Sequence, residues 1–433
     1  MSDKQLARRT KLKVFFDNVD ISTDVNKYLS SLTYTDNAED ETDDIQIKLC
    51  DKDDIWLTKW LNAVAETAPA IASETVGMTP YKVSAQSGVS IRSGPGTGYS
   101  KIVTLPYNSA VKVKNVNNGW ATIIYSDQTA YVTAASIARD DADSDKSSVK
   151  GSTGIKIQAA IIRENRNSDG RDDVLDTGEF ELDGIDISGA PSVINIKGTS
   201  LSYASGVRQE KKNKAWEKYS LSKIAAEISS ISGMTSMFEA TTDPYYARVE
   251  QVDTSDIVFL QKLCKNAGLS LKVTSNIIVL FDEATYEGKA AVRTIIRGGG
   301  GYLKYKLNMG ENDTQYGSCH VSYTDPASGK TIEGTYKDKA SKEDAQTLEI
   351  TERVTSISEA QSVAMKRLRQ KNKFAKTADF TLPGDTGFVA GVTVQLDGWG
   401  FFSGKYIVSQ ARHSIGSSGY TTSIKLRNVL EGY

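Results

Sequence analysis

Short runs in which apolar and polar residues alternate recur along most of this chain, and such alternation is typical of β-strands. β-Branched and aromatic side chains fill many of the apolar positions, as expected for one face of a sheet. The pattern therefore predicts strands throughout the chain. They are expected at Lys11–Phe16, Ile45–Leu49, Ile155–Ile161, Val193–Ile196, Leu269–Val273, Ile277–Phe281, Val392–Leu396 and Thr422–Leu426.

Helical spacing of apolar residues is rarer and predicts three helices, at Ser220–Ser232, Ser255–Ala267 and Ser358–Lys373. Ser220 or Ser222 is a candidate N-cap of the first helix. Gly233 and Gly268 follow the first two helices, at the place where a C-terminal glycine is favoured. We therefore expect a mainly β protein with some α structure.

Two stretches divide the chain. Residues 62–80 are rich in Ala, Thr and Ser without a strong period, and residues 139–154 are charged and rich in Ser. Both read as linkers, because neither contains enough apolar residues at a regular spacing to bury a face. Between them, residues 81–138 form a compact pattern of their own. Two linkers around one small unit predict a domain inserted into a host fold.

The inserted unit carries a recognisable series of motifs. A strand leads into an Arg-Ser-Gly-Pro turn over Val89–Pro95, where Pro95 presets φ and glycines permit a tight backbone. A Leu105-Pro106 step, a strand at Val111–Val113, Gly119-Trp120 and Tyr131-Val132 follow in order. This series resembles the bacterial SH3 domain family, which implies a small SH3-like barrel.

The resemblance also implies a candidate binding surface, because such domains often bind peptidoglycan through aromatic side chains. The candidate wall- or partner-binding residues are Tyr99, Tyr107, Trp120, Tyr125 and Tyr131. The alternative is structural: Trp120 and Tyr131 occupy core positions of the family, and these domains frequently act as spacers or docking modules. Both interpretations stay open at this point.

The remainder of the chain resembles the phage late control D family, the baseplate hubs of contractile tails. The match is clearest near the C-terminus, in Leu382-Pro383-Gly384, Gly391, the stretch Gly404–Val408, His413 and Gly419–Thr422. The stretches Asp43–Trp56 and Leu175–Gly189 resemble hubs of Gram-positive tails or tail-like bacteriocins.

The resemblance implies two small tube-type β-barrels, an α+β middle domain and the inserted SH3-like barrel. We expect the first hub barrel at 1–61 plus 151–205, the SH3 domain at 81–138, the middle domain at 206–290 and the second hub barrel at 291–433. Hubs of this type form homotrimers, which adapt a six-fold tail tube to a three-fold central spike. The implied partners are the spike protein, the tail tube and other baseplate proteins, with peptidoglycan as a further candidate.

Charge and cysteine content narrow the function. With 52 basic and 54 acidic residues the net charge is −2, which gives no field that recruits nucleic acid. Cys50, Cys264 and Cys319 lie far apart and suggest neither a disulfide framework nor a metal site. The N-terminal stretch does not fit a signal peptide, and no window is apolar enough to span a membrane. We expect synthesis in the bacterial cytoplasm, release by lysis, and a location in the baseplate of a virion or tail-like particle.

Groups for catalysis or metal binding are few, so we predict no catalytic residue, cofactor or metal. The chain has two histidines. His320 adjoins Cys319 in a predicted strand, where neighbours point to opposite faces, and His413 fits a structural role. Gly298–Gly301 lacks the lysine of a phosphate loop and reads as a bend. Residues Asn165–Asp176 approximate a calcium loop, but Asn and Asp replace the usual first and last ligands, and a polar turn between strands is the preferred interpretation.

The sequence therefore predicts a structural, non-enzymatic baseplate hub with an inserted SH3 domain. The main alternative is a cell-wall hydrolase targeted by that SH3 domain, although no segment supplies its Cys-His or zinc-ligand set. A secreted adhesin is a third alternative, which the N-terminus disfavours. The sequence leaves open whether the particle is an infectious phage or a headless bacteriocin.

Overall fold

A computed structural model shows a chain built mostly of strands with few helices, so the predicted fold class is confirmed. The chain forms two compact units, one of residues 1–51 with 151–433 and one of residues 52–150. The structure describes residues 8–16, 19–39, 41–53, 55–56, 79–85, 88–105, 110–117, 119–125, 128–139, 155–166, 170–200, 207, 210–274, 277–310, 315–326, 329–338 and 345–430.

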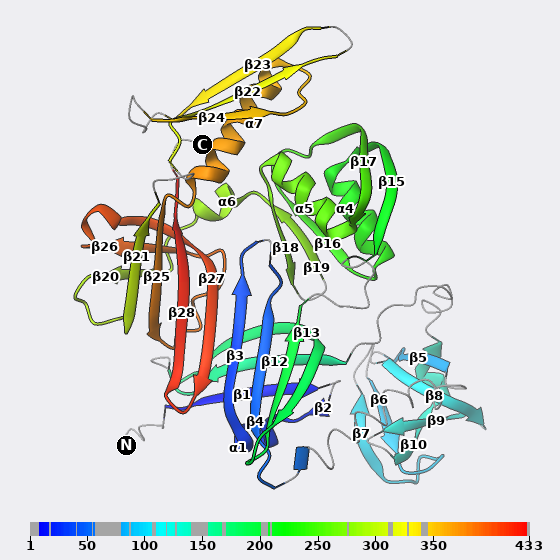
Figure 1. Ribbon diagram of the computed structural model, residues 1–433. Coiled ribbons are helices and arrows are strands. Elements are labelled where there is room, and N and C mark those ends of the chain that lie inside the picture. Colours follow the sequence, from blue (N-terminus) through cyan, green and yellow to red (C-terminus); the bar gives the residue numbers. More distant parts are fainter. Residues whose placement is uncertain are drawn as a thin grey trace. The chain divides into compact units, whose positions relative to one another are not determined.

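A 13-stranded sheet is the main element of the larger unit (Figure 1). Eleven strands follow one another in the order β2-β1-β12-β13-β14-β4-β3-β27-β28-β25-β21, while β26 pairs with β27 and β20. The N-terminal strands are β1 (Thr10–Phe16), β2 (Val19–Asp20), β3 (Leu29–Asn37), β4 (Asp44–Cys50), β12 (Lys156–Arg163), β13 (Asp173–Ser188) and β14 (Val193–Thr199). The C-terminal strands are β20 (Arg293–Ile296), β21 (Lys304–Met309), β25 (Lys376–Pro383), β26 (Thr393–Asp397), β27 (Gly404–Gly416) and β28 (Gly419–Asn428).

The two halves of this sheet share one topology. The N-terminal half runs β1-β12-β13-β14-β4-β3, and the C-terminal half runs β20-β26-β27-β28-β25-β21. Short β2, which pairs with β1, has no counterpart in the C-terminal half. When the other six strands of the N-terminal half and the six of the C-terminal half are numbered along the chain, both orders read 1-4-5-6-3-2. The halves differ at their first strand, because β1 pairs antiparallel with β12 whereas β20 pairs parallel with β26. The sheet is therefore a structural duplication, although no repeat is visible in the sequence.

Strand β3 of the first half pairs antiparallel with β27 of the second, from Ser31–Gly416 to Asn37–Gln410. This pairing makes the two halves one sheet. Whether each half closes into a hub barrel, with the boundaries expected from the sequence, stays a prediction.

The middle segment has its own hydrophobic core. Helix α4 (Leu221–Ile231) and helix α5 (Asp256–Ala267) pack with a two-stranded ribbon and a three-stranded sheet around Trp216, Leu260 and Ile278. Both helices lie where the sequence predicts them. The strands are β15 (Lys211–Ser220), β16 (Thr235–Glu239), β17 (Tyr245–Ser255), β18 (Ser270–Thr274) and β19 (Ile277–Phe281).

Ser220 is the N-cap residue of α4, yet its side chain makes no capping hydrogen bond. Asp243 from the preceding loop of β17 instead accepts the Ser222 N–H at 3.0 Å. The predicted N-cap position, Ser220, is therefore confirmed, but the carboxylate that accepts the hydrogen bond is that of Asp243, from the loop before β17.

Two further helices connect these parts. Short α6 (Glu283–Glu287) follows β19 and begins at Asp282, whose carboxylate accepts the Ala284 N–H. Helix α7 (Ile357–Asn372), also predicted, covers a three-stranded sheet of β22 (Ser318–Thr324), β23 (Thr331–Lys337) and β24 (Thr347–Thr351). Within the described residues, no helix is both long and apolar enough to cross a membrane.

The smaller unit contains a seven-stranded sheet in the order β11-β5-β8-β9-β10-β6-β7. Its buried core consists of its own side chains, among them Val89, Ile91, Ile123 and Val132. The strands are β5 (Thr79–Val83), β6 (Val89–Arg92), β7 (Lys101–Leu105), β8 (Ala110–Asn117), β9 (Trp120–Tyr125), β10 (Gln128–Thr133) and β11 (Ile137–Arg139).

Candidate binding and assembly surfaces

Strands β9 and β10 of the smaller unit bring two of the predicted aromatic residues to one face. Ala121 and Ile123 of β9 are buried, as are Ala130 and Val132 of β10. Because side chains alternate along a strand, Trp120 and Tyr131 lie on the opposite, outer face and are only half-buried. Tyr131 pairs with Thr122, two residues from Trp120, so the two rings are diagonal neighbours.

The core role that the SH3 family suggests for Trp120 and Tyr131 is therefore wrong for this chain. Neither residue belongs to the buried cluster that fills the small sheet. Both side chains are instead partly exposed on the outer face. Of the other candidates, Tyr107 lies outside the described residues, and only the backbone of Tyr125 is described.

Tyr99 packs on the turn that the sequence motif predicts. A Cβ added to Gly94 would come within 2.3 Å of the Tyr99 ring, so glycine is needed there. The Arg92 guanidinium donates to the carbonyls of Thr97 (3.0 Å) and Tyr99 (2.7 Å) and holds the turn closed. Arg92 also pairs with Tyr131 in the sheet, so the turn adjoins the aromatic face. Tyr99 is 52% exposed.

A second site is the joint between the sheet halves, by which we mean the pairing of β3 with β27. His413 lies opposite Tyr34 in this joint, and the rings stack at 5.9 Å between centroids. His413 is fully buried; its Nδ1 lies 2.7 Å from the Tyr420 hydroxyl and its Nε2 lies 2.9 Å from the Phe388 carbonyl. Burial lowers the pKa of His413, which favours a neutral ring whose Nε2 donates to Phe388 and whose Nδ1 accepts from Tyr420.

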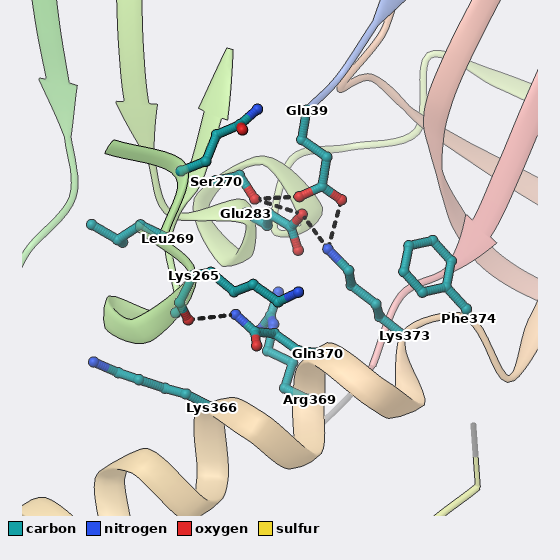
Figure 2. Close-up of a pocket in the computed structure, with 12 residues that line it drawn as sticks. Glu39, Lys265, Leu269, Ser270, Glu283, Lys366, Arg369, Gln370, Lys373 and Phe374 are labelled. Atoms are coloured by element: carbon teal, nitrogen blue, oxygen red, sulfur yellow. Dashed lines mark hydrogen bonds and ion pairs between the residues drawn. The ribbon is translucent and has the colours of Figure 1, made fainter. Parts of the chain in front are cut away.

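The third site is a cluster of buried and half-buried charges that we call the ionic cluster; Figure 2 shows the part of it around Glu39, Glu283 and Lys373. Lys373, after α7, lies 2.6 Å from Glu39, after β3, and 3.0 Å from Glu283 of α6. Arg427 of β28 contacts Glu283 at 2.8 Å and Glu287 at 2.7 Å. Arg369 of α7 completes the cluster with Glu287 at 2.8 Å. Three carboxylates and three cations thus join elements from four parts of the chain.

The surroundings shift the pKa values of the two central glutamates in opposite directions. Burial and the neighbouring Glu283 raise the pKa of Glu39. Burial also opposes ionisation of Glu283, but Arg427 and Lys373 outweigh it and hold its pKa below the ordinary value. Ser270 Oγ lies within 2.9 Å of both carboxyl groups and adds a hydroxyl between them (Figure 2). Among the residues that line a cavity of about 160 Å³ here are Glu39, Ser270, Glu283, Arg369 and Lys373. Their polar groups bind one another, which is typical of a structural role.

A neighbouring ion pair fixes the same region. Lys272 of β18 contacts Asp36 of β3 and lies 3.5 Å from Asp43. Burial raises the pKa of Asp43 to about 6, against the opposing charge of Lys272. Asp36 also accepts the Ala390 N–H at 2.8 Å. The end of β3 is thereby tied both to the middle segment and to the C-terminal half of the sheet.

The remaining candidates have structural environments. Cys319 is buried and its neighbour His320 lies on the other face of β22, as predicted; burial raises the pKa of the Cys319 thiol to about 11. Cys264 is buried in the core of the middle segment. Strands β12 and β13 flank the calcium-like stretch, of which residues 167–169 lie outside the described part. Among described residues, no three His, Cys, Asp or Glu side chains are grouped to hold a metal ion.

Comparison with known proteins agrees with these observations. Residues 87–138 match the bacterial SH3 domain family, so the predicted SH3 domain is confirmed. The chain is also 27% identical over 139 residues to a Bacillus subtilis protein assigned as an N-acetylmuramoyl-L-alanine amidase. That match covers 30% of this chain and spans only about a quarter (26%) of the length of the Bacillus protein.

Two solved structures share the overall fold. The 43 kDa tail protein of prophage MuSo2 from Shewanella oneidensis matches with a TM-score of 0.57 and 10% identity, over 96% of this chain and 98% of that one. A tail protein from Neisseria meningitidis MC58 matches with a TM-score of 0.56 and 9% identity, over 97% of each chain. The chain thus has the fold of phage tail proteins.

We expect the ionic cluster to be sensitive to the loss of one partner. Arg427→Met leaves Glu283 and Glu287 buried with one cation fewer, which should destabilise the region by about 3–5 kcal/mol. Hydrogen–deuterium exchange of α6, α7 and β28 measures this local free energy. The matched control is Lys211→Met, which removes an exposed pair with Asp253 and should cost at most about 1 kcal/mol. Equal protection in the two variants contradicts a stabilising role of the cluster.

The joint should weaken in acid through His413. The pKa of His413 is lower in the folded protein than in the unfolded chain. Below about the ordinary pKa, the imidazole therefore binds a proton in the unfolded chain but stays neutral in the folded one. The stabilisation is complete above the ordinary value of 6.5 and is lost as the pH falls below it. Between pH 7 and 5, the free energy of unfolding of wild type should fall more steeply than that of His413→Gln, by at most about 1.4 kcal/mol per pH unit. Parallel urea midpoints across this range exclude His413 as the cause.

Proposed function

We propose that this chain is a structural baseplate hub of a contractile injection particle. The observation that carries the proposal is the match of nearly the whole chain to two phage tail proteins, each over at least 96% of this chain. The duplicated sheet supports the finer proposal of a homotrimer: three copies carry six similar half-sheets, which suits an adaptor between a six-fold tube and a three-fold spike. The proposed location is the baseplate of a virion or tail-like particle.

The SH3 domain is proposed to contact the cell wall through its aromatic face. Trp120 and Tyr131 lie side by side on the outer face, and Tyr99 lies on the adjoining turn. Partly exposed aromatic rings suit stacking on sugar or peptide surfaces. The small unit has its own core, so it can serve as a binding module without contributing to the larger sheet.

The competing function is a cell-wall hydrolase, which the partial match to an assigned amidase favours. The environments of the available groups speak against it. His413 uses both ring nitrogens in buried hydrogen bonds, and the raised pKa of Cys319 disfavours a thiolate nucleophile.

A zymogram on bacterial cell walls distinguishes the two functions. The purified full chain should give no clearing band, because we assign it no nucleophile, base or metal. Quantitative mass spectrometry of purified particles should then give three copies per particle. A clearing band supports the hydrolase, and six copies or one copy per particle contradicts the trimeric hub.

Wall binding has its own test. The double variant Trp120→Ala/Tyr131→Ala should weaken pull-down of the full chain by purified peptidoglycan at least tenfold, because both stacking surfaces are lost. The control is Ile102→Ala/Val116→Ala, which removes two exposed apolar side chains on β7 and β8 and should bind as wild type. Wild-type binding by the first variant, or no binding by wild type, overturns the assignment to this face.

A further inference from the structure

Among the described residues of the 13-stranded sheet, β21 and the second part of β13 each have an edge without a partner strand, while the outer edge of β1 is paired with β2 at Phe15–Phe16 and blocked farther along. The outer edge of β1 is covered by α1 (Ser22–Tyr28): Ser22 Oγ accepts the Val14 N–H at 2.9 Å, and the Asn26 side chain binds both backbone groups of Leu12. Side chains that satisfy an edge in this way prevent further strand pairing. At the far end of the sheet, the one strand that β21 pairs with in the described part of the chain is β25, and for β20, the other terminal strand of that half, it is β26.

The second open edge lies on β13. Its first part pairs with β12 up to Glu181, and the Leu182 N–H donates to the Ile155 carbonyl at 2.8 Å on the same side. Beyond this point Gly184–Ser188 pairs with β14, on the other side. No strand among the described residues occupies the free side of this second part. Strand β27 has the same division: its start pairs with β26, and its second part, from Gln410, pairs with β3. In the joint, the second part of β27 pairs with β3, whereas the corresponding edge of β13 has no partner strand among the described residues.

The duplication makes β21 the counterpart of β3, since each is the second strand of its half and lies at the end of the order 1-4-5-6-3-2. Strand β3 uses its outer edge to pair with β27, whereas no described residue pairs with the corresponding edge of β21. We propose that β21 of one copy pairs antiparallel with the second part of β13 of the next copy, so that the joint within the chain is repeated between chains. This inference rests on the proposed homotrimer and specifies its interface.

The register follows from the bulges. Both β13 and β27 carry an irregularity against their following strand, after which pairing resumes at Gly184 and Gln410. In the N-terminal half, Gly184 pairs with Lys197, Lys197 with Gln46, and Gln46 with Thr33. In the C-terminal half, Gln410 pairs with Lys425, Lys425 with Asp379, and Asp379 with Lys306. Lys306 is thus the counterpart of Thr33.

Thr33 pairs with Ser414, four residues after Gln410. Lys306 should accordingly lie opposite the residue four positions after Gly184, which is Ser188 of the next copy. In the same antiparallel register Leu307 lies opposite Ile187, Asn308 opposite Asp186, and Met309 opposite Ile185. Apolar residues thereby meet apolar residues on one face of the pair.

Exposure supports this arrangement. In the joint, Leu32 and Tyr34 of β3 are 0% and 5% exposed. Their counterparts on β21 are Tyr305, which is 50% exposed, and the half-buried Leu307. On the proposed partner strand, Ile187 is 45% exposed. Pairing between copies would bury these side chains as the joint buries theirs.

Charge favours the same pair of edges. Strand β21 carries Lys304 and Lys306, and the open part of β13 carries Asp186, which contacts Lys197 of its own chain at 2.6 Å. In the proposed register Lys306 is a diagonal neighbour of Asp186 on the same face. Lysine on an edge strand also opposes pairing with strands in general, because its charge would be buried without a partner. A partner edge that carries an acidic residue is therefore favoured over others. Because the two edges differ, the contact is head-to-tail, and repetition closes into a ring when the rotation permits.

Disulfide trapping of the full chain tests the register. Asn308→Cys/Asp186→Cys places two thiols directly opposite each other between copies, where the Cα separation of about 4.5–5.5 Å suits a disulfide. Oxidation should give covalent species that end at a trimer. The control is Met309→Cys/Asp186→Cys, which is one residue out of register, so its thiols point to opposite faces and should not link.

Failure of Asn308→Cys/Asp186→Cys to link, or equal linking by the control, overturns the proposed edge pairing. Linking beyond the trimer overturns the closed three-membered ring. The hub function is judged separately: three copies per particle without this disulfide leaves the hub intact and the interface wrong. A disulfide-linked trimer of a protein that is absent from particles supports the proposed interface and contradicts the hub function.

Discussion

The pairing of β3 with β27 is the contact on which the larger unit depends, because it converts two similar half-sheets into one sheet. Its two strands are far apart in sequence, so the joint forms only when the ends of the chain meet. Around it, burial excludes water from the His413 ring, and the neighbouring charges are paired instead of solvated. The joint therefore holds the two halves in one sheet, and comparison with it identifies the edges of β13 and β21 that have no partner strand.

The ionic cluster and the Lys272 pair attach everything else to this joint. Glu39 and Asp36 come from the end of β3, Lys272 from the middle segment, and Lys373 from the end of α7. A shift of any one of these elements would leave a buried charge without its partner, which is costly. The middle segment and α7 are thus held to the sheet by specific pairs, in addition to apolar packing. The SH3 domain differs, since its insertion between β4 and β12 adds a unit with its own core.

Local patterns in the sequence were sufficient for the elements. Alternation placed strands such as β4 and β12, helical spacing placed α4, α5 and α7, and a series of motifs identified the SH3 domain. The face of the sheet on which a side chain lies was harder to predict from the sequence. Trp120 was open to a core interpretation because the family uses that position so, whereas alternation with the buried Ala121 and Ile123 sets the ring outward.

Long-range features could not be predicted in the same way. No spacing links Glu39 to Lys373, because charged residues are spread over the whole chain and only the fold selects which ones meet. The duplication shows no repeat in the sequence, since the order of strands in a sheet is a property of pairing; only the family resemblance implied two similar barrels. The open edges of β13 and β21 likewise acquire meaning only beside the occupied edges of β27 and β3.

A cryo-electron-microscopy reconstruction of the assembled particle, at a resolution that separates strands, tests the central claim most directly. The account predicts three copies in a ring of six half-sheets, in which the contact between copies repeats the joint within each copy, β21 beside β13. A ring in which neighbouring copies meet through other elements, with both of these edges facing solvent, would contradict it.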